Sequence, residues 1–100
     1  MAVAVIGHFR IPPDRLEEAR PAMARVIEAT RAEPGCISYS YALDVAVPGL
    51  VRVSELWESR EHLAAHFESE HMIQWISERQ ALDVFDRQIT AYALGPAEPL

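Results

Sequence analysis

With 100 residues, the chain has the length of one small domain, enough for a single hydrophobic core under a relatively large surface. Half of the residues are hydrophobic, and no apolar run approaches the roughly 20 residues of a membrane-spanning helix, so we expect neither a disordered chain nor a membrane partner. The net charge is -6 and there is no lysine, which argues against a nucleic-acid partner.

The N-terminus and the cysteine content favour a cytoplasmic protein. MAVAVIGHFR has no basic region before its apolar segment, so it is not typical of a secretory signal. The single Cys36 cannot form an internal disulfide, which fits a reducing compartment. We interpret Cys36 as a small packed residue at the start of a strand.

The first expected elements are a strand and a long helix. β-branched and aromatic residues predict a strand over residues 3–10. Asp14 and Glu17 have capping-box spacing and predict a helix from residue 14 to about residue 32. Pro21 lies two turns inside this helix and should kink it or delay its regular part, because proline removes one backbone hydrogen bond.

A hairpin follows. Glu33-Pro34-Gly35 predicts the end of the helix, since the residue before proline avoids the α region and glycine permits a left-handed turn. Residues 36–44 alternate as a strand does, with one face made of large side chains, Ile37, Tyr39, Tyr41 and Leu43. A Pro-Gly turn within residues 45–49 leads to a third strand over 50–57.

Two short helices and a last strand complete the domain. Ser59 and Ser69 each have the position of an N-cap, the final strand is expected over residues 83–94, and residues 95–100 form a tail. The order β-α-β-β-α-β predicts a single α+β domain with a ferredoxin-like four-stranded antiparallel sheet and helices on one face. Because the other sheet face would stay exposed, we expect a homodimer in which two sheets cover each other.

Several motifs together resemble the antibiotic biosynthesis monooxygenase (ABM) domain family. They are the turn Glu33-Pro34-Gly35-Cys36 before a strand with Tyr39, the strand end Glu55-Leu56-Trp57-Glu58-Ser59, and His66 followed by Ser69-Glu70-His71. The similarity covers almost the whole chain and is nearest to the quinol-monooxygenase members. It implies a dimeric α+β barrel with a ligand pocket between sheet and helices.

Members of this family differ in activity. Several oxidise phenols, quinols or aromatic polyketides with dioxygen and no metal or flavin, whereas others degrade haem or isomerise small signalling sugars. In this chain Ile76, Gly7 and His66 stand where the haem-degrading branch has its axial histidine, its asparagine and its tryptophan. These departures argue against haem as a substrate.

His66 is the first candidate catalytic residue, as a base or as a group that orients the substrate. It shares a helix face with Leu63 and Phe67, and an imidazole titrates near neutral pH. The alternative is a core histidine that bonds a backbone carbonyl or Glu55. No cofactor is expected, because a deprotonated phenol can react with dioxygen directly in a pocket that excludes water.

Glu55 is the second candidate catalytic residue, since its carboxylate lies on one strand face between Val53 and Trp57. It could orient His66 or accept a proton itself. The structural alternative is an ion pair with one of three arginines. These are Arg10, Arg52 and Arg87.

The candidate substrate-binding residues are Trp57, Tyr39, His71, Phe67 and His8. Trp57 and Tyr39 suit a flat ring, although aromatic residues on a strand equally pack a core. His71 is also placed to bond across the helix break, and His8 to lie in the dimer interface.

The spacing of His62 and His66 could place two metal ligands on one helix face, but the signal is weak and we expect no metal. The sequence thus predicts a cofactor-independent monooxygenase acting on a small phenol or quinol. The alternative is a non-catalytic or isomerising small-molecule-binding protein of the same fold.

Overall fold

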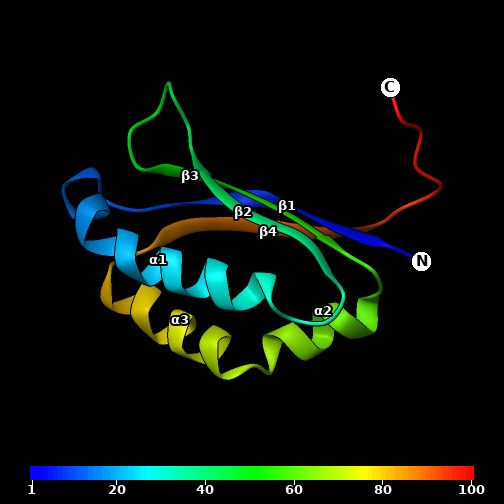
Figure 1. The fold of residues 1–100 in the computed structure, drawn as a ribbon. Helices are drawn as coiled ribbons and strands as arrows, with labels where there is room; N and C mark the ends of the chain where they lie inside the picture. The colour runs from blue at the N-terminus through cyan, green and yellow to red at the C-terminus, as the bar shows by residue number, and fades with distance from the viewer.

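The computed structural model describes residues 1–100 and consists of a four-stranded antiparallel sheet with all helices on one face (Figure 1). The strands are β1 (Val3–Arg10), β2 (Cys36–Leu43), β3 (Leu50–Trp57) and β4 (Phe85–Ala93), in the order β2-β3-β1-β4. The helices are α1 (Leu16–Arg31), α2 (Arg60–Phe67) and α3 (Glu70–Ala81). This arrangement confirms the predicted ferredoxin-like α+β fold.

The strand register places residues of the inner sheet face, which the helices cover, in level rows. Val5 of β1 lies opposite Glu55 of β3, and Glu55 lies opposite Tyr39 of β2. The next row contains Val53 and Tyr41. Because side chains alternate across a strand, all five point toward the helices. The sheet therefore carries a carboxylate and two phenols into the interior of the protein.

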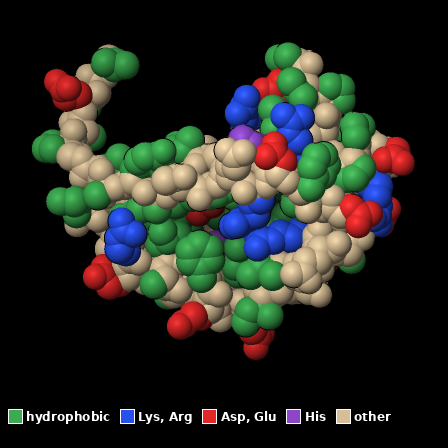
Figure 2. Space-filling model, turned by 180° about the vertical axis from the view of Figure 1, so that it is seen from behind, with side chains coloured by type: hydrophobic (Ala, Val, Ile, Leu, Met, Phe, Trp, Pro, Cys, Tyr) green, Lys and Arg blue, Asp and Glu red, His purple; other side chains and the backbone are tan.

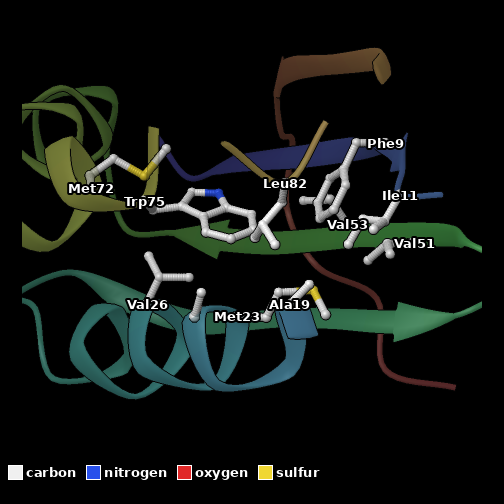
Figure 3. Close-up of a cluster of buried hydrophobic side chains, with 11 residues drawn as sticks. Phe9, Ile11, Ala19, Met23, Val26, Val51, Val53, Met72, Trp75 and Leu82 are labelled. Carbon is white, nitrogen blue, oxygen red and sulfur yellow. The ribbon is translucent and has the colours of Figure 1, made fainter. Parts of the chain in front are cut away.

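Most of the core is an apolar cluster between α1, α3 and the sheet (Figure 3). Trp75 of α3 is 1% exposed, and its ring lies between helix and sheet with its centroid 6.0 Å from that of Phe9. Replacing such a ring by alanine costs about 3–5 kcal/mol of stability. The other buried members are Ile11, Ala19, Ala22, Met23, Val26, Val51, Val53, Met72 and Leu82. A second cluster consists of Val3, Val5, Tyr39, Trp57 and Leu63.

The start of α1 differs from the sequence prediction. The predicted capping box does not form, because the chain makes a 3-10 turn at Pro13–Arg15 and α1 begins at Leu16 without a side-chain cap. A proline in the first position, with its fixed φ, suits this tight turn. The helix then continues through Pro21 to Arg31, so its regular part is not interrupted at the proline. Pro21 lies on the exposed side of the helix.

Two strand ends also differ from the alternation in the sequence. Ile37 was expected to point inward with Tyr39, but it is 52% exposed because the pairing of β2 with β3 shifts register between Cys36 and Ser38. The last strand begins at Phe85 rather than at residue 83. Asp83 has a φ of 60°, a left-handed conformation that suits the turn before the strand rather than extended backbone.

The helices cover the inner face of the sheet less closely on the side of β4. α1 packs closely on β2 and on α3, whereas α3 has few close contacts with β4. Figure 2 shows this side: basic side chains gather over the middle of a hollow beneath the sheet, and acidic and histidine atoms lie deeper in it. No helix is long and apolar enough to cross a membrane.

Candidate functional site

Three buried side chains with polar groups lie where α2 covers the inner sheet face. Tyr39 and His66 are each 1% exposed, and Glu55 is 8% exposed. The His66 ring packs against Tyr39 and Trp57, at centroid distances of 5.4 Å and 4.9 Å. Tyr39 and Trp57 thus lie together around an imidazole, and both are fully buried, as core residues are.

His66 is held at one nitrogen and free at the other. Its Nδ1 lies 2.6 Å from Glu33 Oε2, while its Nε2 is buried and has no hydrogen-bond partner. Because an ionised carboxylate can only accept, the proton of the neutral ring belongs on Nδ1, which leaves the Nε2 lone pair bare. Burial lowers the pKa of His66, against the opposing effect of the Glu33 carboxylate. A neutral, oriented imidazole with one free nitrogen has the form of a general base.

Glu33 is the functional candidate that sequence reasoning missed. It follows α1 in the Glu-Pro-Gly turn, where Gly35 adopts a φ of 79° as predicted, and this turn brings Glu33 to α2. Its Oε2 also lies 3.2 Å from His71 Nε2. The only sequence signal was the turn motif itself, because no local spacing relates residue 33 to residue 66.

The break between α2 and α3 holds these groups in place. Ser69 caps α3, as predicted, by accepting the Met72 N–H, and its hydroxyl donates to the His66 carbonyl over 2.7 Å. The same hydroxyl lies 3.2 Å from His71 Nε2. His71 therefore bonds the capping serine of its own helix, rather than reaching across the break to α2, and also approaches Glu33.

Glu55 has a different partner from those expected. Its Oε1 accepts a hydrogen bond of 2.9 Å from Trp57 Nε1, and it makes no ion pair. Burial raises the pKa of Glu55, and the Trp57 hydrogen bond partly opposes the rise. The predicted ion pair is wrong, because Arg10 bonds Asp86 and Arg52 bonds Asp44.

The role of orienting His66, which the sequence offered to Glu55, belongs to Glu33. Arg87, the third expected partner of Glu55, forms no hydrogen bond or ion pair with it but is near enough for its charge to lower the Glu55 pKa. Glu55 is therefore a buried carboxyl without a countercharge in contact.

Two tyrosines extend the polar row along the sheet. The Tyr39 and Tyr41 hydroxyls are 2.7 Å apart. Burial raises the pKa of Tyr39 far above its ordinary value and that of Tyr41 to about 12, so both phenols are protonated at neutral pH. One O–H group is used in the bond between the two tyrosines, and the other can donate a hydrogen bond to a bound anion.

The remaining candidates are not all brought together. Phe67 lies beside His66 at a ring distance of 5.4 Å but is 47% exposed. His8 lies on the outer sheet face, 3.3 Å from Asp86, and does not join the site. The structure therefore separates His8 from the other predicted site residues.

The possible metal ligands in the structure differ from the pair His62 and His66 considered from the sequence. His62 bonds Ser59 through Nδ1 at 2.6 Å, and it does not pair with His66. Glu33, His66 and His71 instead offer one carboxylate oxygen and two imidazole nitrogens within 4.8 Å of one another. This set could hold a divalent cation, although Glu33 already links both histidines.

The structure has no cavity lined by His66, which differs from the open pocket expected there. A groove of about 240 Å³ lies between α1 and the β2 side of the sheet. It is lined by Arg20, Met23, Ala24, Ile27, Tyr41, Leu43 and Val51. The surroundings of His66 are filled by side chains, so a ligand reaches Nε2 only if some of them move.

The comparisons with known proteins fit this architecture. The family model for antibiotic biosynthesis monooxygenases (ABM) matches residues 2–78, which include Glu33, Glu55, His66 and His71. The chain belongs to the ABM family. The match ends before β4, so the last strand of this ABM domain lies outside it.

Individual relatives of this ABM protein cover nearly its whole length. A candidate antibiotic biosynthesis monooxygenase from Deinococcus radiodurans is 27% identical, with a TM-score of 0.90 over 100% of this chain and 98% of that one. Rv0793 from Mycobacterium tuberculosis is 29% identical, with a TM-score of 0.79 over 99% and 98%. An uncharacterized protein of Synechocystis, sll1783, is 29% identical over 98% of this chain and 67% of its own length. The family supports a monooxygenase-like role and leaves the substrate open.

Proposed function

We propose that this ABM protein oxidises a small phenol or hydroquinone with dioxygen, without a cofactor. The observation that carries the proposal is His66, whose Nδ1 is bound to Glu33 and whose buried Nε2 has no partner. A nitrogen prepared in this way can take the phenolic proton, and Glu33 stabilises the imidazolium that results.

The chemistry needs an anion because dioxygen has two unpaired electrons and reacts slowly with closed-shell molecules. A phenolate or hydroquinone anion can transfer one electron to dioxygen, and the two radicals then combine at a ring carbon. Loss of water leaves a quinone, so the substrate supplies every electron and dioxygen supplies the added oxygen atom. In the balanced reaction, one hydroquinone and one dioxygen give one hydroxybenzoquinone and one water.

The aromatic side chains around His66 suit such a ring. Trp57 and Tyr39 pack against the imidazole, and the O–H group that is not used between Tyr39 and Tyr41 is a potential donor to an oxyanion. Phe67 is half exposed beside His66, and we expect its ring to move when a substrate enters. A flat substrate could then take the place of the Phe67 ring against His66 and keep water out of the site.

Oxygen uptake with a panel of hydroquinones and naphthols tests the proposal directly. We expect uptake above the buffer rate with at least one compound and a loss of about 100-fold in His66→Phe, the range typical of a removed general base. His8→Phe is the matched control, because His8 lies on the opposite sheet face. No uptake with any compound, or full activity in His66→Phe, would refute the function or the role of His66, respectively.

A second candidate is a non-catalytic or isomerising small-molecule-binding protein. The filled surroundings of His66 favour it, because an oxygenase site must admit its substrate. Binding of the same aromatic compounds without oxygen uptake would decide for this candidate.

We also propose that the protein is a homodimer formed through the outer sheet face. On this face Ile6 and Tyr92 are 51% and 53% exposed, and they alternate with inward core positions of β1 and β4. Sedimentation should give a mass twice that of the chain, and Ile6→Asp should shift it toward the monomer. A monomeric wild-type protein would refute this assembly.

A further inference from the structure

Two arginines without partners lie on either side of the turn between α3 and β4. Arg79 is in the last turn of α3, and Arg87 follows the start of β4. Neither side chain forms a hydrogen bond or an ion pair; Arg79 is partly exposed and Arg87 is exposed. Figure 2 shows basic side chains gathered over the middle of this hollow.

The backbone holds the two arginines close to each other and to the site. The Val84 N–H donates to the Arg79 carbonyl over 3.0 Å, so the chain reverses tightly between α3 and β4. Arg87 is two residues before Ile89, whose side chain packs on the core, and therefore points to the inner face as well. Both arginines act electrostatically on Tyr41.

The nearby carboxylates cannot neutralise this pair, because each serves another arginine. Glu78 bonds Arg25 at 2.6 Å and Asp83 bonds Arg15 at 2.7 Å. Asp86 bonds Arg10 at 2.9 Å. The remaining neighbour, Glu55, is held by Trp57.

Arg79 is partly buried and Arg87 is exposed, and two like charges that lie near each other without a counter-ion disfavour the protein without a bound anion. Burial and the charge of Arg87 both lower the pKa of Arg79, which is the effect expected of an uncompensated pair. A guanidinium presents a planar fork of donors that matches a carboxylate or phosphate. The pair is therefore suited to an anionic group of a ligand.

We propose that Arg79 and Arg87 clamp the carboxylate of the substrate, which makes the substrate a hydroxylated aromatic acid rather than a neutral quinol. This inference rests on the proposed oxidation for the phenolic part of the molecule. The acid group binds at the hollow, and the ring extends under the sheet toward Tyr41 and the His66 region. Both arginines lie beyond residues 2–78, which match the family model.

Calorimetric titration with 2,5-dihydroxybenzoate and hydroquinone tests the clamp without requiring turnover. We expect the acid to bind the wild-type protein about tenfold or more tightly than hydroquinone, because hydrogen bonds between charged groups are the strong ones. In the double variant Arg79→Gln, Arg87→Gln the two affinities should become equal. Arg60→Gln, which removes another arginine without a partner, should keep the preference. Equal affinities in the wild-type protein, or a preference that survives the double variant, would overturn the clamp.

Thermal unfolding distinguishes the clamp from a structural role. Removing two like charges should leave the melting temperature of the unliganded double variant unchanged or higher, and 2,5-dihydroxybenzoate should no longer raise it. A clear fall in the unliganded melting temperature would assign the arginines to stability and overturn the proposal. Oxygen uptake is a separate readout. A carboxylate preference without uptake supports the clamp and refutes the oxidation, whereas uptake without the preference does the reverse.

Discussion

The Glu33–His66 contact gives the sharpest test of the site, because it can be measured without knowing the substrate. Glu33→Ala would remove the acceptor of the Nδ1 proton and leave both nitrogens of a ring that is 1% exposed without partners. Leaving a buried donor unsatisfied costs about 1–3 kcal/mol. Each kcal/mol lowers the melting temperature of a domain of this size by about 4–8 °C.

Glu33→Gln is the matched control for this perturbation. The amide oxygen can still accept the Nδ1 proton, so the loss of stability should be smaller than in Glu33→Ala. The negative charge is gone, however, and since Glu33 raises the pKa of His66, that pKa should fall further in the variant. The charge of His71, which lowers the His66 pKa, is then the main electrostatic influence left.

Chemical denaturation and nitrogen-detected NMR of the histidine rings measure these effects. Wild-type His66 should show a protonated Nδ1 and a bare Nε2. If the proton is found on Nε2, or if Glu33→Ala is as stable as the wild-type protein, the reasoning about this pair is wrong.

Three further results are expected. The pKa of Glu55 is raised above its ordinary 4.5, so just above pH 4.5 the folded protein keeps a proton that the unfolded chain has lost. The free energy of unfolding should therefore decrease as the pH rises from 4.5 through the pKa of folded Glu55. Glu55→Gln should abolish this decrease in denaturation curves, and an unchanged pH dependence would contradict the assignment. Trp57→Phe removes the hydrogen-bond donor to Glu55 and should lower the free energy of unfolding by about 1–3 kcal/mol in denaturation curves. A variant as stable as the wild-type protein would contradict this expectation. Treatment with a chelator should leave oxygen uptake unchanged, whereas stoichiometric metal lost in His71→Ala would show that Glu33, His66 and His71 bind an ion.

Local patterns predicted most of the fold because its elements depend on near neighbours. The alternation in β3 places Glu55 and Trp57 on one face, and the serines before α2 and α3 cap helices as expected. The start of α1 and the orientation of Ile37 were predicted wrongly, because another local feature outweighed the pattern used for the prediction. At Pro13–Arg15 the proline favoured a 3-10 turn over the capping box, and at Ile37 a shift in strand pairing reversed the exposure.

The candidate site was only partly predictable. His66, Tyr39 and Trp57 lie together as the pattern indicated, since each belongs to an apolar face. His8 is an equally plausible residue by type, yet it faces the other side of the sheet. The choice of partner for Glu55 also went to an adjacent indole rather than to a distant arginine.

The sequence by itself determined the order of the elements, the inward row of the sheet and the identity of the histidine at its centre, because these follow from periodicity and turn residues. The tertiary structure decided the charges that act on that histidine. Glu33 is 33 residues away in the chain and meets His66 only because the turn after α1 lies against α2. Arg79 and Arg87 are likewise without partners only because folding gives the neighbouring carboxylates to other arginines, and long-range pairing of this kind has no signature in local sequence.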